Sequence, residues 1–283
     1  VVDLHAITVN QDPKVLKNNI RETVATFIAS GIDPKKSIIF NQSQVSAHSE
    51  VAWILSCVAR MGWLNRMTQF KEKAGKDKEK ASIGLYSYPI LMAADILLYD
   101  SEIVPVGKDQ KQHLEITRDI AKSFNHNYGD TFIIPESKID KNVQTVLGTD
   151  GRKMSKTYQN TIDIFADEKS LKKQIMSIVT DSKGIEDKKN PESCNIFNIF
   201  KLIASEDEVK KMKKNYVEGG YGYGHAKTHL LNLILDLYRE ERKLYSELIK
   251  NPGHLYDILL KGEKKARIIA EKVLRRVRSK LGY

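Results

Sequence analysis

The stretch that decides the fold covers residues 84–122 and reads GLYSYPILMAADILLYDSEIVPVGKDQKQHLEITRDIAK. Its pattern predicts an apolar helix, a short buried strand, a glycine turn and an amphipathic helix, in that order. Asp95 interrupts the apolar run from Pro89 to Tyr99, and residues 107–110 (GKDQ) follow the predicted strand. Because ligands of open α/β sheets bind beyond the carboxyl ends of the strands, we expect a binding site at this edge.

The rest of the chain changes character near residue 165. Before it, predicted strands at residues 1–7, 37–41 and 131–134 alternate with helices. From residue 170 onward the spacing is almost wholly helical. We therefore predict an α/β fold, with a Rossmann-like parallel sheet flanked by helices in residues 1–165 and an all-helical domain in residues 166–283.

The composition argues against several classes of protein. No apolar stretch approaches the roughly 20 residues that span a bilayer, so we expect no membrane segment. The two cysteines, Cys57 and Cys194, are far apart and have no CxxC partner. This usage argues against a disulfide framework and a thiolate metal site, and it fits the reducing cytoplasm.

The positive charge of the chain is concentrated at its end. The formal net charge is +10, and residues 255–283 alone contain nine Lys or Arg and three Asp or Glu. A predicted helix there has one apolar stripe and a basic remainder, which is either merely solvated or contacts nucleic-acid phosphates. The basic side chains in question are Arg267, Lys272, Arg275, Arg276, Arg278 and Lys280.

Asp95 shares a predicted helix face with Tyr88 and Met92, because the three residues are spaced i, i+4 and i+7. A buried carboxylate is costly unless it meets a donor or a cation. Two interpretations follow: a structural ion pair with a basic residue elsewhere, or a hydrogen-bond acceptor for a ligand N–H in an apolar slot.

Two further polar segments have similar alternatives. Asp109 either caps the following helix or, with Gly107 and Gln110, binds a ligand at the end of the strand. Lys153 and Lys156 follow a tight Thr-Asp-Gly turn. They are either part of a basic surface loop or a cationic arm that stabilises charge on a leaving pyrophosphate. Phosphoryl and nucleotidyl transfer require from the protein mainly positioning and electrostatics, which lysines on a loop can supply.

Taken together, these segments resemble one family. Residues 153–157 (KMSKT) are similar to the lysine signature loop of class I aminoacyl-tRNA synthetases. Residues 88–99 and 104–119 resemble the bacterial tryptophanyl-tRNA synthetases, as do shorter matches at residues 3–8, 66–73 and 179–182. The resemblance extends over essentially the whole chain. Thr157 stands where Ser is commoner, and Lys108 stands where the bacterial pattern often has Glu.

The resemblance implies roles for individual residues. Asp95 would accept a hydrogen bond from the indole N–H of tryptophan, and Tyr88 and Gln110 would hold the α-amino group. The side chains packing round the indole ring would be His5, Met92, Val104 and Val106. Asp109 would bind the ATP ribose beside Gly107. The loops over the ATP phosphates would contribute Lys71, Lys73, Lys153, Met154, Ser155 and Lys156, of which Lys73, Lys153 and Lys156 would be catalytic.

The same resemblance implies the reaction and the partners. ATP with Mg²⁺ would activate L-tryptophan to tryptophanyl-adenylate, which would acylate tRNA(Trp), and no residue is assigned as a protein metal ligand. Residues 166–283 would bind the anticodon. The protein would be a cytoplasmic homodimer, with a plausible apolar interface in residues 47–70 that includes Trp53, Cys57, Met61 and Trp63.

Two alternatives stay open at this point. The first is the sister tyrosyl-tRNA synthetase, and the second is a non-catalytic relative that binds RNA or a ligand. The resemblance also implies that a first strand and the histidine-rich ATP signature of the family would precede Val1, and the 283 residues do not contain them.

Overall fold

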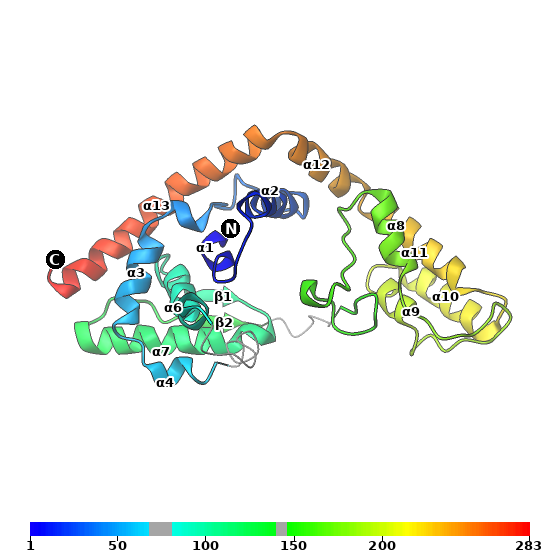
Figure 1. The fold of residues 1–283 in the computed structure, drawn as a ribbon, viewed down its shortest axis with the longest axis horizontal. Coiled ribbons are helices and arrows are strands. Elements are labelled where there is room, and N and C mark those ends of the chain that lie inside the picture. The colour runs from blue at the N-terminus through cyan, green and yellow to red at the C-terminus, as the bar shows by residue number, and fades with distance from the viewer. Residues whose placement is uncertain (68–80, 140–145) are drawn as a thin grey trace. The chain divides into compact units, whose positions relative to one another are not determined.

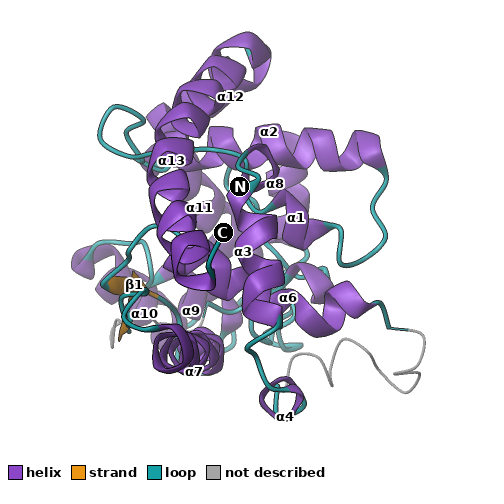
Figure 2. Ribbon diagram, turned by 90° about the vertical axis from the view of Figure 1, so that its left-hand side faces the viewer, coloured by secondary structure: helices purple, strands orange, loops and turns teal. Residues whose placement is uncertain are grey.

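The computed structural model describes residues 1–67, 81–139 and 146–283. Contacts between Cα atoms divide the chain into two compact units, residues 1–143 with 248–283 and residues 144–247. Helices dominate both units, and the sheet found among the described residues has two short strands (Figures 1 and 2). None of the helices in the described part of the chain has the length and apolar character needed to cross a membrane.

The first unit contains the whole stretch quoted above. Its described helices are α1 (Asp3–Ala6), α2 (Pro13–Ala29), α3 (Ala47–Ser56), α4 (Met61–Leu64), α6 (Ile83–Leu97), α7 (Lys111–Tyr128) and α13 (Pro252–Leu281). The 3₁₀ turns are η1 (Gln42–Gln44) and η3 (Lys108–Gln110), and the strands are β1 (Ile103–Pro105) and β2 (Glu136–Lys138).

Helix α6 is the centre of this unit because it packs against both α3 and α7. Its side chains Ala93, Leu97 and the following Leu98 are at most 2% exposed and join one apolar cluster with residues of α3 and α7. Removing this apolar surface from water is the main stabilising contribution to such a core. The predicted order of apolar helix, short strand and amphipathic helix is confirmed in this stretch. The strand is not buried as predicted, since Ile103 and Pro105 of β1 are exposed and Val104 is partly buried.

Helix α13 returns to the first unit although it lies at the end of the sequence. Ala266, Ala270 and Val273 on its apolar stripe are fully buried in the same cluster as α3 and α6. Gly262 permits close approach to the segment that precedes η1, since a Cβ atom there would lie 1.9 Å from the carbonyl oxygen of Ile39. The division of the chain thus differs from the predicted boundary at residue 165, because the apolar face of α13 finds its partners before residue 100.

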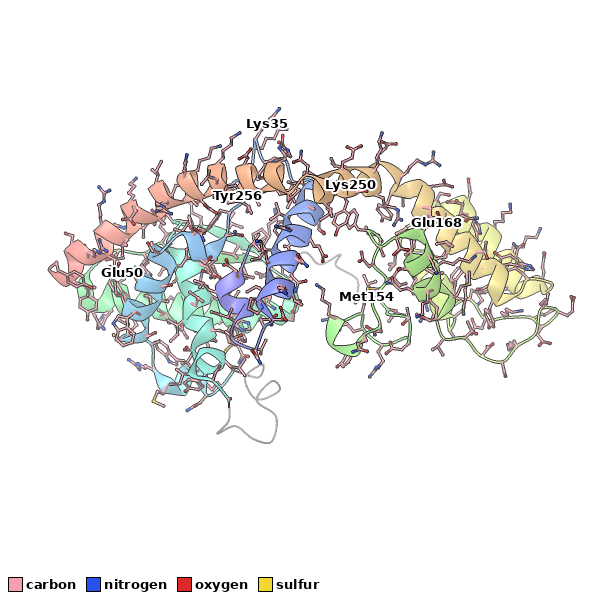
Figure 3. The ribbon with its side chains drawn as sticks, turned by 45° about the horizontal axis from the view of Figure 1, so that its top comes forward. Lys35, Glu50, Met154, Glu168, Lys250 and Tyr256 are labelled. Carbon is pink, nitrogen blue, oxygen red and sulfur yellow. The ribbon has the colours of Figure 1, made fainter. Side chains whose placement is uncertain are left out.

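Two ion pairs fix α13 further. Arg278 makes a bidentate pair with Glu50 of α3, with both N–O distances 2.6 Å, and Figure 3 shows Glu50 on that helix. Arg276 binds both carboxylate oxygens of Asp100. These arginines, which the sequence placed on a basic face, therefore hold the helix against its own unit.

The two strands are parallel and pair Ile103 with Glu136 through Pro105 with Lys138. The strand predicted at residues 131–134 is wrong in position. There the side chain of Asn125 takes the backbone groups that a ladder would use: its Oδ1 accepts from the amides of Thr131 and Phe132 at 3.1 and 2.8 Å, and its Nδ2 donates to the Phe132 carbonyl at 2.8 Å. The strand begins at residue 136, once the backbone groups can pair with β1.

The predicted strands at residues 1–7 and 37–41 are also wrong. Residues 3–6 form the single turn α1, where Asp3 Oδ1 accepts hydrogen bonds from the amides of Leu4 and Ser43 at 3.1 and 2.9 Å. Residues 38–41 have no strand assignment. The two segments do meet, since the Val1 amino group donates to the Phe40 carbonyl at 2.6 Å and the Gln42 amide to the Val1 carbonyl at 2.9 Å. Both hydrogen bonds involve Val1, and the two segments do not continue as a β-ladder.

The second unit is helical apart from the loop at its start. Its described elements are η4 (Lys156–Tyr158), α8 (Glu168–Met176), α9 (Asn195–Phe200), α10 (Glu206–Glu218), α11 (Tyr223–Leu237) and most of α12 (Arg239–Lys250). Its core is a separate apolar cluster that includes Phe197, Phe200 and Tyr216, each at most 2% exposed. The prediction of helices beyond residue 170 is confirmed.

Candidate active site

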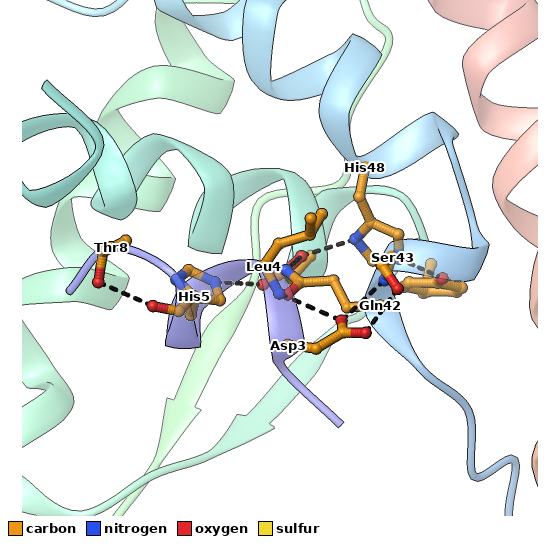
Figure 4. Close-up of polar contacts among 9 residues, drawn as sticks. Asp3, Leu4, His5, Thr8, Gln42, Ser43 and His48 are labelled. Atoms are coloured by element: carbon orange, nitrogen blue, oxygen red, sulfur yellow. Dashed lines mark hydrogen bonds and ion pairs between the residues drawn. The ribbon is translucent and has the colours of Figure 1, made fainter. Parts of the chain in front are cut away.

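The side chain of Asp95 meets hydrogen-bonding side chains from three different elements of the first unit. Figure 4 labels these partners, which are His5, Gln42 and His48. Its Oδ1 accepts from Gln42 Nε2 of η1 at 2.6 Å and lies 2.6 Å from His48 Nδ1 of α3. Its Oδ2 lies 2.8 Å from His5 Nε2 of α1. The side chain of Asp95 is 20% exposed, so the carboxylate is enclosed but still reachable. The structure thus places Asp95 and His5 together, as the resemblance implied.

The electrostatics of this cluster favour the ionised carboxylate. Burial of Asp95 opposes ionisation, but the hydrogen bonds from His48 and His5 outweigh it and lower the pKa of the carboxyl group below its usual value. Burial, assisted by the negative charge of Asp95, raises the pKa of the nearby Tyr99 hydroxyl. Asp95 therefore acts as an acceptor for any N–H that reaches it.

Tyr88 and Met92 occupy the same helix as Asp95, two turns and one turn earlier, respectively. The Tyr88 hydroxyl lies 2.8 Å from Nε2 of the buried His113, and burial raises the pKa of Tyr88. The Tyr88 ring meets the His5 ring edge-on, with their centroids 6.2 Å apart. Met92, Val104 and Val106 are partly buried.

Residues 107–110 lie between β1 and α7, as predicted. Gly107 accepts a backbone hydrogen bond from Gln110 at 3.0 Å, and the Gln110 Nε2 atom donates to Asp109 Oδ2 at 2.9 Å. Asp109 is exposed. Helix α7 has Gln110 as its N-cap residue, so Asp109 is not the N-cap.

The lysine loop belongs to the second unit and is held by its own contacts. The loop residues 148–156 turn back at Gly151, which has φ of +81°, and Leu147 pairs with Lys153 as an isolated bridge. Lys153 and Lys156 are exposed, whereas Met154 and Ser155 are partly buried, and Figure 3 shows Met154 on this loop. The two lysine side chains can therefore reach an anionic ligand in solvent.

Asn160, which the sequence did not single out, is the residue that shapes this loop. It is 2% exposed, its Oδ1 accepts from the Ser155 amide at 2.8 Å, and its Nδ2 donates to Asp150 Oδ1 at 2.7 Å and to the Lys153 carbonyl at 3.1 Å. The hydrogen bond from Asn160 is the main cause that lowers the pKa of Asp150 to about 2. Gly148 leaves room for the Asn160 side chain, because a Cβ atom at residue 148 would lie 2.3 Å from the side-chain amide of Asn160.

Other predicted residues have different outcomes. Lys71 and Lys73 lie outside the described residues. In the described part of the chain, no group of three or more His, Cys, Asp or Glu side chains is arranged to hold a metal ion. Gln42, His48 and Tyr99 contact Asp95 or its partners and were missed by the sequence reasoning, because a lone sequence does not show which distant polar side chains meet in the fold.

Comparison with known proteins places this geometry in a family. The family described as tRNA synthetases class I (W and Y) matches residues 1–239. The chain belongs to this family. The tryptophan–tRNA ligase of Campylobacter jejuni (strain RM1221) is 50% identical over 282 residues, which cover 100% of this chain and 88% of that protein. The tryptophan–tRNA ligase of Fusobacterium nucleatum is 47% identical over 283 residues, which cover 100% of this chain and 86% of that protein.

A solved structure agrees with these class I synthetase relatives. The tryptophanyl-tRNA synthetase of Campylobacter jejuni, complexed with ADP and tryptophan, matches with a TM-score of 0.93 at 49% identity, covering 100% of this chain and 88% of that chain. The resemblance to this synthetase family and the predicted fold class, a small parallel sheet flanked by helices with a helical remainder, are thus confirmed.

Proposed function

We propose that this chain is a tryptophan–tRNA ligase that activates L-tryptophan with ATP and transfers it to tRNA(Trp). The observation that carries the proposal is the partly exposed Asp95 carboxylate, on a helix face with Tyr88 and Met92, in a chain half identical to named tryptophan–tRNA ligases. The proposed reaction needs no protein nucleophile. A carboxylate oxygen of tryptophan attacks the α-phosphorus of ATP, the bond to the bridging oxygen breaks, and pyrophosphate leaves.

Asp95 would select the amino acid. Its carboxylate is ionised and is partly removed from solvent, so a ligand with a matching N–H gains a charge-assisted hydrogen bond. A ligand without that donor leaves the carboxylate desolvated and unpaired, which rejects it by roughly 10⁴-fold in sites of this kind. His5, Met92, Val104 and Val106 would contact the indole ring. Tyr88 and Gln110 would hold the α-amino group.

Two sets of residues would bind the nucleotide: Gly107 and Asp109 in the first unit, and the lysine loop in the second unit. Asp109 is exposed beyond β1 and offers carboxylate oxygens to ribose hydroxyls. Lys153 and Lys156, with the Met154 and Ser155 backbone between them, would lie over the phosphates, and Lys71 and Lys73 would add positive charge. Mg²⁺ would arrive with the nucleotide and be held mainly by its phosphates, as is usual for this ion.

The experiment that tests this function is ATP–pyrophosphate exchange with the protein expressed from its complete gene. We expect exchange that depends on tryptophan and is at background with tyrosine. Preferential exchange with tyrosine would favour a tyrosyl-tRNA synthetase. Tryptophan binding without exchange by either amino acid would favour a non-catalytic relative and would contradict the proposal.

The proposed tRNA surface includes the basic side of α13. Arg276 and Arg278 are engaged with Asp100 and Glu50, and Arg267 donates to the Gln44 carbonyl at 2.6 Å. The remaining basic side chains on this helix are exposed: Lys261, Lys264, Lys265, Lys272, Arg275 and Lys280. These side chains lie within residues 166–283, for which the anticodon-binding role is proposed.

Replacing Lys272 and Arg275 by Ala is expected to weaken tRNA binding and reduce its salt dependence. Each lost phosphate contact should make the slope of log K against log salt shallower by roughly 0.7 to 0.9. Filter binding or aminoacylation over a salt series measures this slope. The matched control is Lys14→Ala on α2, which is also exposed. Exchange without tRNA should be unchanged, and an unaltered salt slope would argue against this surface.

The proposed homodimer would bury the exposed apolar side chains of α3 and α4. Trp53 is 73% exposed and Met61 is 71% exposed, and Cys57 is exposed as well. Replacing Trp53 by Ser should weaken dimerisation by about 30-fold or more, because a central aromatic anchor typically contributes 2 kcal/mol or more. Sedimentation equilibrium measures the dissociation constant. Ile268→Ser, at a side chain 74% exposed on α13, serves as the control. A monomeric parent protein would contradict the dimer.

The proposed location is the cytoplasm, where tRNA and ATP are both available. Fractionation of cells that produce the protein would test it.

A further inference from the structure

A chain of buried hydrogen bonds stands behind the carboxylate of Asp95. The Tyr99 hydroxyl lies 2.7 Å from His48 Nε2, and His48 Nδ1 lies 2.6 Å from Asp95 Oδ1. His48 is 2% exposed, and Gln42, which donates to the same Oδ1 atom, is 3% exposed. These three residues have no role in the functions implied by the family resemblance.

The hydrogen-bond partners assign the tautomer of His48. A carboxylate can only accept, so the His48 nitrogen that faces Asp95 must carry a proton. Tyr99 stays protonated, since burial and the charge of Asp95 both raise the pKa of its hydroxyl. Its O–H can therefore donate to Nε2, which is the acceptor nitrogen in the tautomer that carries its proton on Nδ1. Tyr99 thus sets the tautomer that makes His48 a donor to Asp95.

The two oxygens of Asp95 are consequently different. Oδ1 accepts from two buried donors, Gln42 and His48. Oδ2 is paired with His5, whose side chain is 18% exposed and lies on the more open side of the cluster. The network therefore fixes the rotation of the carboxylate through Oδ1 and leaves Oδ2 beside His5, the more exposed of its partners.

We propose that His48, with its tautomer set by Tyr99, is a positioning residue for tryptophan recognition: it anchors Asp95 Oδ1 so that Oδ2 is presented to the indole N–H. The inference rests on the proposed function of the site. Hydrogen-bond strength falls steeply with misalignment, and functional groups need placement within about 0.5 Å and 10–20°. Loss of the anchor should therefore weaken recognition of the N–H more than general binding of the amino acid.

A matched pair of substitutions separates the two ends of the imidazole. His48→Asn places an amide nitrogen near the position of Nδ1 and keeps a donor to Asp95. His48→Gln places the amide near Nε2, which keeps a partner for Tyr99 and withdraws the donor from Asp95. We expect His48→Gln to raise the KM for tryptophan by about 10-fold, the equivalent of one hydrogen bond, and His48→Asn to rescue most of that loss. The kcat of exchange should change by less than about 3-fold in both, because the anchor acts on binding.

The decisive readout is discrimination between tryptophan and its benzothiophene analogue, in which sulfur replaces the indole N–H. The preference for tryptophan should fall about 10-fold in His48→Gln and be restored in His48→Asn, because only one of the two ligands uses Asp95 Oδ2. Exchange assays with each amino acid measure the two KM values. His126→Gln, at an exposed histidine on α7, is the control and should match the parent protein.

Three results would overturn the inference. Equal loss for both amino acids would mean that His48 only supports the fold, and equal behaviour of the Asn and Gln variants would mean that the donor at Nδ1 is irrelevant. Should neither variant fold, Tyr99→Phe removes a single oxygen, and an unchanged preference for tryptophan in that variant would be the third contrary result. Absence of tryptophan binding by the parent protein would instead refute the proposed function itself.

Discussion

Replacing Asp95 by Asn is expected to lower kcat/KM for tryptophan by roughly 10³- to 10⁴-fold while the protein stays folded. The surrounding donors explain why so small a change should have so large an effect. Gln42 Nε2 and His48 Nδ1 both point at the Oδ1 position, so the amide oxygen of Asn will take that place. The amide NH₂ then occupies the Oδ2 position and faces the indole N–H with a donor in place of an acceptor.

The measurement is tryptophan-dependent pyrophosphate exchange, with circular dichroism melting as the check on folding. Asp119→Asn, at an exposed position of α7, is the matched control and should leave both unchanged. The benzothiophene analogue should lose far less than tryptophan in the Asp95 variant, since it has no N–H to be repelled. A tryptophan KM equal to that of the parent protein would refute the role of Asp95.

The elements that could be predicted are those whose signals are local. The apolar run of α6, the strand at residues 103–105 and the amphipathic α7 all have short-range periodicity, and each is present where its pattern indicated. The face shared by Tyr88, Met92 and Asp95 follows from helix geometry alone. The candidate substrate residues on α6 could therefore be placed without a structure.

The elements that could not be predicted depend on partners distant in sequence. Residues 37–41 have the composition of a strand, but a strand also needs a ladder. The backbone contacts between this segment and residues 1–7, such as the one from the Val1 amino group to the Phe40 carbonyl, do not form one. Helix α13 has the same periodicity as the helices of the second unit, and the sequence does not reveal which core its apolar stripe joins. Its apolar stripe packs in the core of the first unit, although the sequence grouped it with residues 166–283, because periodicity specifies a face and leaves its partner unspecified.

The polar network around Asp95 could not be predicted from the sequence for the same reason. His48 and Gln42 lie 47 and 53 residues from Asp95 along the chain, and polar residues at the start of a helix are usually solvated. Only the folded chain shows that they are buried against one carboxylate. The ligand residues of a site can thus be recognised from a motif, whereas the residues that orient them require the structure.

Replacing either Lys153 or Lys156 by Ala is expected to lower the kcat of pyrophosphate exchange by roughly 10²- to 10³-fold, the usual cost of losing one group that stabilises transition-state charge. Negative charge accumulates on the pyrophosphate as the bond to the α-phosphorus breaks, and a cation placed there acts more on the transition state than on the bound substrates. The KM for tryptophan should therefore change by less than about 3-fold, because the lysines do not bind the amino acid.

The structure makes this a clean test of charge, since the lysine loop is held by Asn160 through the Ser155 amide and the Lys153 carbonyl. Truncating the exposed lysine side chains removes none of these contacts. The loop should therefore keep its shape, and the melting temperature of the protein should not change. Lys172→Ala, at an exposed lysine of α8 in the same unit, is the control. Lys153→Arg should recover part of the rate, because it restores a cation with different geometry. An unchanged kcat in both Ala variants would leave the loop as a basic surface, and it would assign the stabilisation of the leaving group to residues elsewhere in the chain.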